Sequence, residues 1–172
     1  MSNKVLPPPP FLTTYNSYSI GNLLIGDALD TTTPVTTAWG TANLAIYIPF
    51  YSNTMWKFTT FSWRNGTTAS GNIDCGLYTF DGVKLVSTGT VAQSGTSAIQ
   101  NATVASTTIG VGVFFLAMAL SSATGTIYCV SEINAGLAIS HGIFNQGTAF
   151  NLPATATFAD PTSLLVPLIS IS

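Results

Sequence analysis

The residues that could do acid–base chemistry are few and lie far apart in the sequence. The chain has one histidine, His141, and six acidic residues: Asp27, Asp30, Asp74, Asp81, Glu132 and Asp160. A catalytic triad needs a serine, a histidine and an acid together, and no Gly-x-Ser-x-Gly motif marks a nucleophile. A glycosidase needs two carboxylates about 5–9 Å apart across a cleft, which no spacing in this sequence establishes. We therefore expect no catalytic residues and interpret His141 as a loop histidine.

Metal and cofactor sites have as little support. Cys75 and Cys129 form no Cys-x-x-Cys pair, and with one histidine a zinc site lacks ligands. Asp27 and Asp30 lie in a Thr-rich loop and could share a calcium ion, but the spacing of an EF-hand is absent. We expect no metal and no cofactor, and we interpret both cysteines as buried free thiols. A disulfide between them stays open as an alternative.

The composition limits the partners that this chain can bind. Charged residues make up only 6% of the chain, compared with roughly 25% in ordinary soluble proteins. The basic residues Lys4, Lys57, Arg64 and Lys84 are scattered, so they cannot form the stripe that neutralises phosphates. The most apolar segment, residues 109–120, is too short to span a bilayer as a helix. We expect neither nucleic acid nor membrane as a partner, whereas so few charges favour packing against copies of the same chain.

The elements that must position these residues are short strands. The best local signal is a hairpin of residues 72–80 and 83–87 joined by Asp81-Gly82, a pair typical of a type I′ turn. Ile73, Cys75 and Leu77 share one face of its first strand, and Val83 and Leu85 share one face of its second, so both faces must be covered.

Further strands and turns follow at regular spacing. We expect strands at residues 44–48 (closed by Pro49), 55–63, 98–104, 113–120 and 126–131, and a turn at Asn65-Gly66. No stretch is typical of a capped amphipathic helix. Turns about ten residues apart are typical of sandwiches and jelly rolls. The sequence therefore predicts an all-β fold, an antiparallel β-sandwich that is jelly-roll-like.

Both ends of the chain differ from this pattern. We expect residues 1–14 to form an extended Pro-rich arm that docks on a neighbouring subunit or partner, because Pro7-Pro8-Pro9-Pro10 favours polyproline II, and a disordered tail is the alternative. We expect residues 15–172 to form a single β-sandwich domain. An apolar terminus is either the last strand of a sheet or a segment buried between subunits, and both alternatives stay open. The candidate assembly residues are Val5, Leu6, Pro7, Pro8, Pro9, Pro10, Phe11, Leu164, Leu165, Val166, Leu168 and Ile169.

Aromatic residues provide one alternative function, which is binding of a glycan. The candidates for a sugar-stacking surface are Tyr15, Tyr18, Trp39, Tyr47, Tyr51, Trp56 and Trp63. Most of them should instead belong to the core.

The central segment resembles a known family. Residues 72–78 (Asn-Ile-Asp-Cys-Gly-Leu-Tyr), the Asp81-Gly82 turn, residues 85–89 (Leu-Val-Ser-Thr-Gly) and residues 92–95 (Ala-Gln-Ser-Gly) resemble a β-sandwich module in virion structural proteins of tailed bacteriophages. The apolar run 113–120 resembles a later strand of that module, so the likeness covers about residues 43–133. This chain departs from the pattern at Cys75, where an aliphatic residue is usual, and in its Pro-rich arm.

The resemblance implies a function and a location. It implies a non-enzymatic capsid decoration, head-fibre or tail component, often a homotrimer. From the apolar residues at both ends of the chain, we expect the protein to pack on the particle through its termini, against copies of itself and other virion proteins. A receptor- or glycan-binding module of a tail fibre is the alternative. The N-terminus has no apolar stretch before its prolines, so we expect no secretory signal, synthesis in the host cytoplasm and a final location in the virion.

Overall fold

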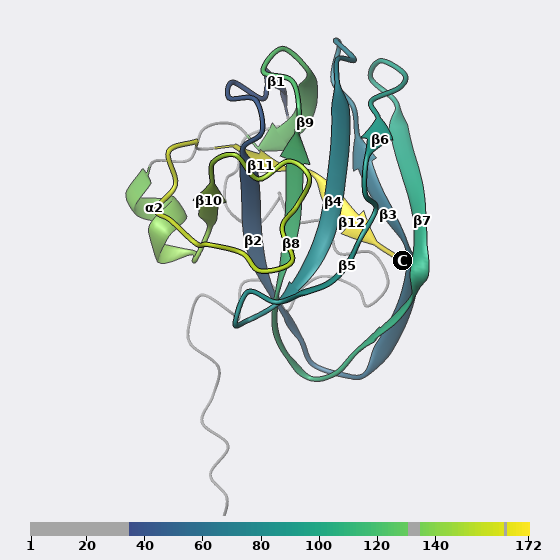
Figure 1. Ribbon diagram of the computed structural model, residues 1–172, viewed down its shortest axis with the longest axis vertical. Helices are drawn as coiled ribbons and strands as arrows, with labels where there is room; N and C mark the ends of the chain where they lie inside the picture. Colours follow the sequence, from purple (N-terminus) through teal and green to yellow (C-terminus); the bar gives the residue numbers. More distant parts are fainter. Residues whose placement is uncertain (1–34, 131–134, 164) are drawn as a thin grey trace, which may run out of the picture.

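The chain folds as a β-sandwich whose two layers are antiparallel (Figure 1). The computed structural model describes residues 35–130, 135–163 and 165–172. The strands of the first layer are β2 (Ala45–Ser52), β4 (Asn72–Thr79), β5 (Lys84–Ser87), β6 (Val91–Ala92), β8 (Gly112–Leu120) and β10 (Phe144–Gln146). The strands of the second layer are β1 (Val35–Ala38), β3 (Trp56–Arg64), β7 (Ile99–Ile109), β9 (Thr126–Val130), β11 (Val166–Pro167) and β12 (Ile169–Ile171).

The strand order confirms the expected architecture. The first layer has the order β10-β2-β8-β4-β5, with β6 also pairing β4. The second layer consists of the ladders β1-β9-β11 and β12-β3-β7, which join where Leu168 N–H donates to Tyr128 O at 3.0 Å. The chain changes layer at each step from β1 to β4 and again from β7 to β9, the alternation that a jelly-roll-like sandwich requires.

The core lies between the layers and is built by alternating residues of facing strands. In β4, Ile73, Cys75 and Leu77 point inward and are fully buried, as the sequence predicted. The central strand β8 was also predicted correctly as a buried strand. From the second layer, Phe61 and Trp63 pack against them. Burial of each large side chain of this kind contributes roughly 1.5–3 kcal/mol, so this core is the main source of stability.

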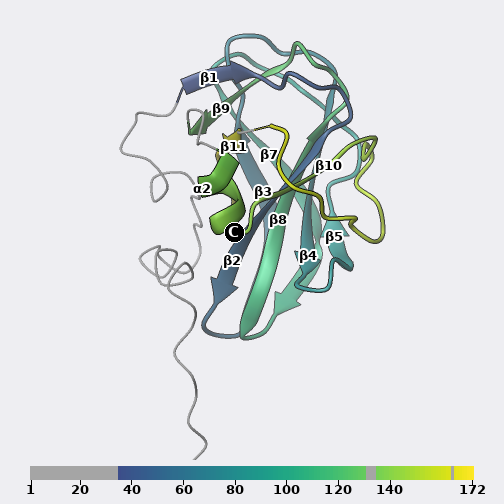
Figure 2. The same cartoon turned by 90° about the vertical axis from the view of Figure 1, so that its left-hand side faces the viewer.

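The outer face of the first layer is covered by a long connection. Residues 147–163, which we call the strap, follow β10 and cross β2, β8 and β4 (Figures 1 and 2). The sheet beneath the strap is lined by small residues, among them Ala117, Ala119 and Gly76, beside the rings of Tyr47 and Tyr78. These small residues let the strap approach closely, so the strap adds a third layer outside this sheet.

The Asp81-Gly82 hairpin forms as predicted, but its turn type was wrong. Thr79 N–H donates to Val83 O at 2.9 Å, and Gly82 N–H donates to Thr79 O at 3.0 Å. Of the two central residues only Gly82 has a positive φ, of 80°. This is a three-residue loop closed by a left-handed glycine, and not the type I′ turn that requires two such residues.

The apolar face predicted for the second hairpin strand was also wrong. The pairing of β4 with β5 shifts between Leu77, which faces Val86, and Tyr78, which faces Lys84. This irregularity turns Val86 toward the core and leaves Val83 and Leu85 exposed. Strict alternation fails because a bulge in β5 exchanges the faces.

Two further local predictions need correction. Pro49 does not close its strand but lies inside β2 opposite Phe115, because β10 pairs only the first part of β2 and leaves the proline at a free edge. Asn65-Gly66 is not a turn, since the side chain of Asn65 is buried at the end of β3. A Cβ at Gly66 would collide with the hydroxyl groups of Thr36 and Thr126, so glycine is needed there for close packing.

A short helix, α2 (Ala135–Ser140), was not predicted. The chain leaves the helix through Gly142, whose φ is 70°. Ile143 N–H donates to Ala138 O, and Gly142 N–H donates to Ile139 O. This is a Schellman motif, which satisfies the last carbonyls of so short a helix. In the part of the chain that the structure describes, no helix is long and apolar enough to cross a membrane. The predicted arm, residues 1–14, lies outside the described residues.

Candidate functional site

Asp74, in the middle of β4, is a buried ionisable residue with several hydrogen-bond partners. Its carboxylate points to the outer face of the first layer and is fully buried beneath the strap. Oδ2 accepts a hydrogen bond from Leu152 N–H at 3.0 Å, and Oδ1 accepts one from the Thr88 hydroxyl at 3.3 Å. Burial raises the pKa of the Asp74 carboxyl, although the bond from Leu152 and the charge of Lys84 act in the opposite direction.

Two other side chains hold the strap beside Asp74. The ammonium group of Lys84 donates to Leu152 O at 2.7 Å, and the Tyr78 hydroxyl donates to Pro153 O at 2.7 Å. Burial also raises the pKa of the phenol of Tyr78. The side chains of Asp74, Lys84 and Tyr78 therefore all form hydrogen bonds with the backbone of strap residues 152 and 153.

The same polar cluster extends to the next strand. Tyr47 of β2 donates to Gln146 Oε1 at 2.8 Å, and its ring lies edge-on to that of Tyr78 at a centroid distance of 5.3 Å. Burial raises the pKa of Tyr47 to about 12, so its phenol is neutral and donates at physiological pH. Gln146 Oε1 also accepts from Thr157 N–H at 2.9 Å, which fixes the strap at a second place, residue 157.

This arrangement fixes backbone in place and offers little to a substrate. The oxygens of Asp74 are engaged by a backbone N–H and a hydroxyl, and the aromatic hydroxyls donate to groups of the same chain. The Asp74 carboxylate holds the backbone of Leu152, which lies 78 residues away in the sequence. We interpret the cluster as a clamp that holds the strap on the sheet.

The remaining candidates for catalysis do not gather around this clamp. His141 is half-buried just after α2, whereas Asp81 and Asp160 are exposed in loops. Asp27, Asp30 and Glu132 lie outside the described residues. Among the residues that the structure describes, no group of three or more histidine, cysteine or acidic side chains could hold a metal ion.

The two cysteines are free and buried, as predicted from the sequence. Cys75 faces the core from β4 and Cys129 from β9. Burial raises the pKa of both thiols, which keeps them protonated and inert.

The predicted assembly residues fall into two groups. Those of the arm, Val5 to Phe11, lie outside the described residues, as does Leu164. For the C-terminus, the structure shows the strand alternative, because β11 pairs β9 and β12 pairs β3. Leu165, Val166 and Ile169 are buried within their own chain and Leu168 is partly buried, so these side chains leave little surface for a neighbour. Their role in assembly stays a prediction.

The predicted sugar-stacking aromatics are divided between core and surface. Trp39, Tyr47 and Trp63 are buried, and Trp63 donates to the buried amide oxygen of Asn65 at 3.0 Å. Tyr51 and Trp56 are partly exposed, whereas Tyr15 and Tyr18 lie outside the described residues. Of the candidates that the structure describes, Tyr51 and Trp56 are therefore the two with surface that a ligand could contact.

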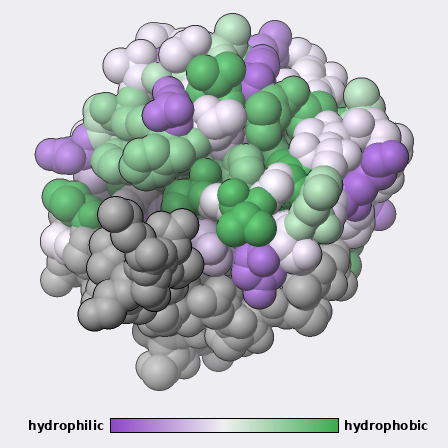
Figure 3. All heavy atoms as spheres, turned by 90° about the horizontal axis from the view of Figure 1, so that it is seen from below, coloured by the Kyte–Doolittle hydropathy of each residue, from purple (hydrophilic) through white to green (hydrophobic). Residues whose placement is uncertain are grey.

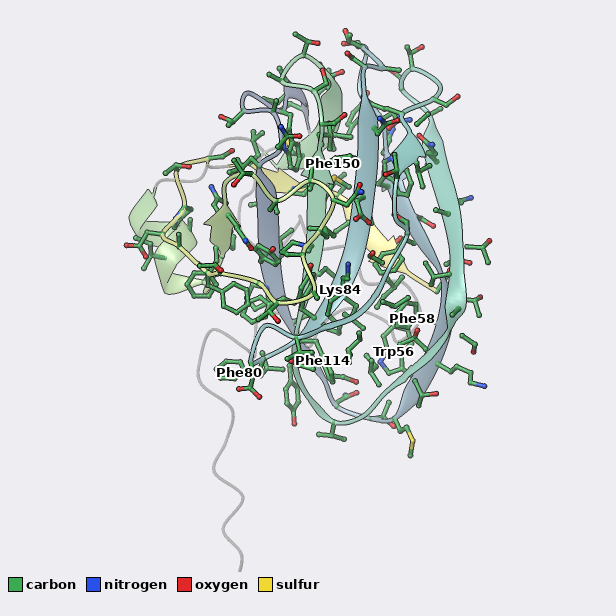
Figure 4. All side chains as sticks on the ribbon, viewed as in Figure 1. Trp56, Phe58, Phe80, Lys84, Phe114 and Phe150 are labelled. Carbon is green, nitrogen blue, oxygen red and sulfur yellow. The ribbon has the colours of Figure 1, made fainter. Side chains whose placement is uncertain are left out.

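Apolar groups are exposed at the lower end of the sandwich in Figure 1. It carries Met55, Phe80 and Val111, each more than 60% exposed, on the turns β2–β3, β4–β5 and β7–β8. Figure 3 looks onto this end and shows hydrophobic residues gathered on it, and Figure 4 shows Trp56 and Phe114 there as well. We call this surface the apolar end.

The second surface is the outer edge of β7. This strand pairs β3 on one side only, and it has eleven residues, the most of any described strand. Neither surface was predicted from the sequence. The low charge of this strand is visible in the sequence, because the chain carries no charged residue between Lys84 and Glu132.

The chain matches no family model, no curated protein and no solved structure.

Proposed function

We propose that this protein is a non-enzymatic structural protein of a virus particle. It is a β-sandwich that packs on the particle as a capsid decoration or head-fibre component of a tailed bacteriophage does. The sequence support is the resemblance of residues 72–95 and 113–120 to a module of such particles. The fold is compatible with this role, because it is an antiparallel β-sandwich like the module that the sequence resembles.

The observation that carries the proposal is the uncharged edge of β7. Soluble proteins usually protect long edge strands with lysine, proline or a covering loop, because an open edge pairs with other chains. A bulge interrupts β7 after Thr103, but residues 99–103 before it contain neither charge nor proline, and no described strand pairs with their outer edge. Such an edge is a liability for a freely diffusing protein, but an attachment surface for one that is built into an assembly.

The use of the buried ionisable residue supports the same function. Asp74 lies beneath the strap, and its oxygens bind backbone and hydroxyl groups of its own chain. An acidic side chain used in this way fixes the strap on the sheet and is covered by its own chain. The partners in this proposal are copies of the same chain and other virion proteins, and the chain is made in the host cytoplasm and ends in the virion.

The test is to locate the chain in particles from the infected cells that produce it. Particles are purified on a density gradient, washed at high salt, and quantified by mass spectrometry against their other proteins. We expect the chain to remain at a fixed ratio to the other particle proteins. A chain that stays in the soluble fraction and is absent from the particles would overturn the proposal.

A second candidate function, binding of a receptor glycan at a fibre tip, is favoured by the apolar end. Phe80 is 64% exposed and stacks on Phe115 with an interplanar angle of 20°, and Trp56 is partly exposed at the same end. Flat aromatic faces of this kind can stack on sugar rings. A glycan array tests this function, since Phe80→Ala and Trp56→Ala must abolish any specific binding that the wild type shows.

A further inference from the structure

We propose that two copies of this chain pair through the edge of β7, antiparallel and about a two-fold axis near Asn101. This inference rests on the proposed function, in which copies pack against one another, and it names the surface that they use. It extends the β12-β3-β7 ladder across two molecules.

The regular part of β7 has the length of an ordinary pairing strand. Residues 99–103 pair with residues 60–64 of β3 in continuous register, and the pairing then shifts between Phe58 and Thr60. Three residues of β7, 104–106, stand there opposite one residue of β3. This bulge interrupts the outer edge as well, so the stretch available to a partner is residues 99–103. Five residues is close to the common length of a strand in globular proteins.

The backbone of this stretch determines what kind of partner fits. The outer edge of a strand presents unpaired N–H and C=O groups, which an extended strand satisfies. Side chains alternate along β7, with Ile99, Asn101 and Thr103 exposed and Gln100 and Ala102 turned partly toward the core. The partner strand therefore meets a narrow row of small or neutral side chains.

The charge of this row favours a second copy as the occupant. In an isologous antiparallel pair every residue meets its own type or a neighbour from the same strand, so like charges would oppose one another. Residues 99–109 carry no charge, so two copies approach without repulsion. A different protein would be oriented by complementary charges, and this edge has none to offer. With the axis at Asn101, Ile99 of each copy, which is 70% exposed, packs against Thr103 of the other.

Two-fold pairing has a consequence for the number of copies. The family resemblance implies a trimer, whereas an isologous edge contact gives a dimer or a larger assembly with an even number of chains. The two arrangements differ in mass and in their response to a charge at residue 101.

The experiment uses the full chain with Asn101→Lys or Asn101→Glu, measured by native mass spectrometry and light scattering. Either charge alone places like charges opposite each other across the axis, so each variant is expected to have half the mass of the wild type. Mixing equal amounts of the two variants must restore the wild-type mass, because opposite charges then meet. Asn53→Lys, which adds the same charge at an exposed turn, must leave the mass unchanged.

Three results would overturn the inference: a monomeric wild type, an assembly that Asn101→Lys and Asn101→Glu leave intact, or a mixture that fails to re-associate. Circular dichroism of each variant shows whether it is folded. The proposed function is judged separately, because a chain found in purified particles retains that function even when the edge of β7 is not the contact.

Discussion

The backbone N–H of Leu152 donates a hydrogen bond of 3.0 Å to Oδ2 of Asp74, although 78 residues separate them in the sequence. This bond joins the strap to the middle of β4, a central strand of the first layer. Lys84 binds the carbonyl of the same leucine and Tyr78 binds the next carbonyl, so the clamp works on both the donor and the acceptors of one short segment. Stability of the outer layer therefore depends on a few polar contacts as well as on apolar packing.

The Asp74 carboxyl gives the protein a specific dependence on pH. Burial raises its pKa in the folded state above that of the unfolded chain, which is about 3.9. The folded protein then binds more protons between the two pKa values, and stability due to this group falls as pH rises through the raised pKa. The stability due to the Asp74 carboxyl is fully present only below the pKa of this group in the unfolded chain. Asp74→Asn removes this titration, so we expect a smaller change of unfolding free energy from acidic to neutral pH.

Urea unfolding at a series of pH values measures this difference. Asp160→Asn removes one exposed carboxylate and is the matched control. An unchanged pH dependence in Asp74→Asn would show that the buried carboxylate is not the titrating group.

Tyr78→Phe tests the second contact of the clamp. The ring still packs edge-on against Tyr47, but the 2.7 Å bond to Pro153 O is lost. Loss of one such bond costs about 1 kcal/mol of unfolding free energy. We also expect faster proteolysis within the strap. Tyr128→Phe is the control, because the Tyr128 ring lies under Arg64 at 4.0 Å and belongs to β9, in the layer opposite the one that the strap covers. Equal effects of the two substitutions on proteolysis would contradict the clamp.

Gly76→Ala tests how closely the strap approaches the sheet. A Cβ at residue 76 would lie 2.8 Å from Cδ1 of Leu152 and 3.3 Å from Cβ of Ser87. The leucine must move, and overpacking of this kind costs about 1–3 kcal/mol. Gly110→Ala is the control, since nothing lies within 4 Å of its added Cβ. The thermal unfolding temperatures of the two variants are compared. A Gly76→Ala variant as stable as Gly110→Ala would refute the close packing of the strap on residue 76.

Deletion of residues 1–10 tests the assembly role predicted for the Pro-rich arm. These residues lie outside the described part, and the core is built from residues beyond them. We expect a folded protein with an unchanged unfolding temperature but weaker incorporation into particles. Co-purification with density-banded particles measures the effect. Incorporation equal to that of the full chain would show that the arm is dispensable for assembly.

The strands of the fold follow from local patterns, and that is why most were predictable. Alternation of Ile73, Cys75 and Leu77 places β4, and the apolar run with glycine on its N-terminal side places β8. The errors occur where a bulge or a neighbouring strand decides the outcome. The bulge in β5 exposes Leu85, and the short β10 leaves Pro49 at a free edge. No local pattern contains this information, because each depends on a partner strand elsewhere.

The clamp was less predictable than the strands. In the sequence Asp74 is one of six acids, and its partners lie in a Gly- and Pro-containing segment that predicts no regular structure. Contact between β4 and residues 152–153 arises only once the strap has crossed the sheet. The edge of β7 was equally hard to predict, because the charge-free stretch between Lys84 and Glu132 also includes β6, β8 and β9 and does not show which strand lies at an edge.

Sedimentation velocity of the purified full chain tests the central claim most directly, which is that this protein is built to pack against neighbours. The account predicts a species whose mass is a multiple of the 17.9 kDa chain, persisting on dilution and at high salt because the contacts are uncharged. A single 17.9 kDa monomer at all concentrations would contradict it.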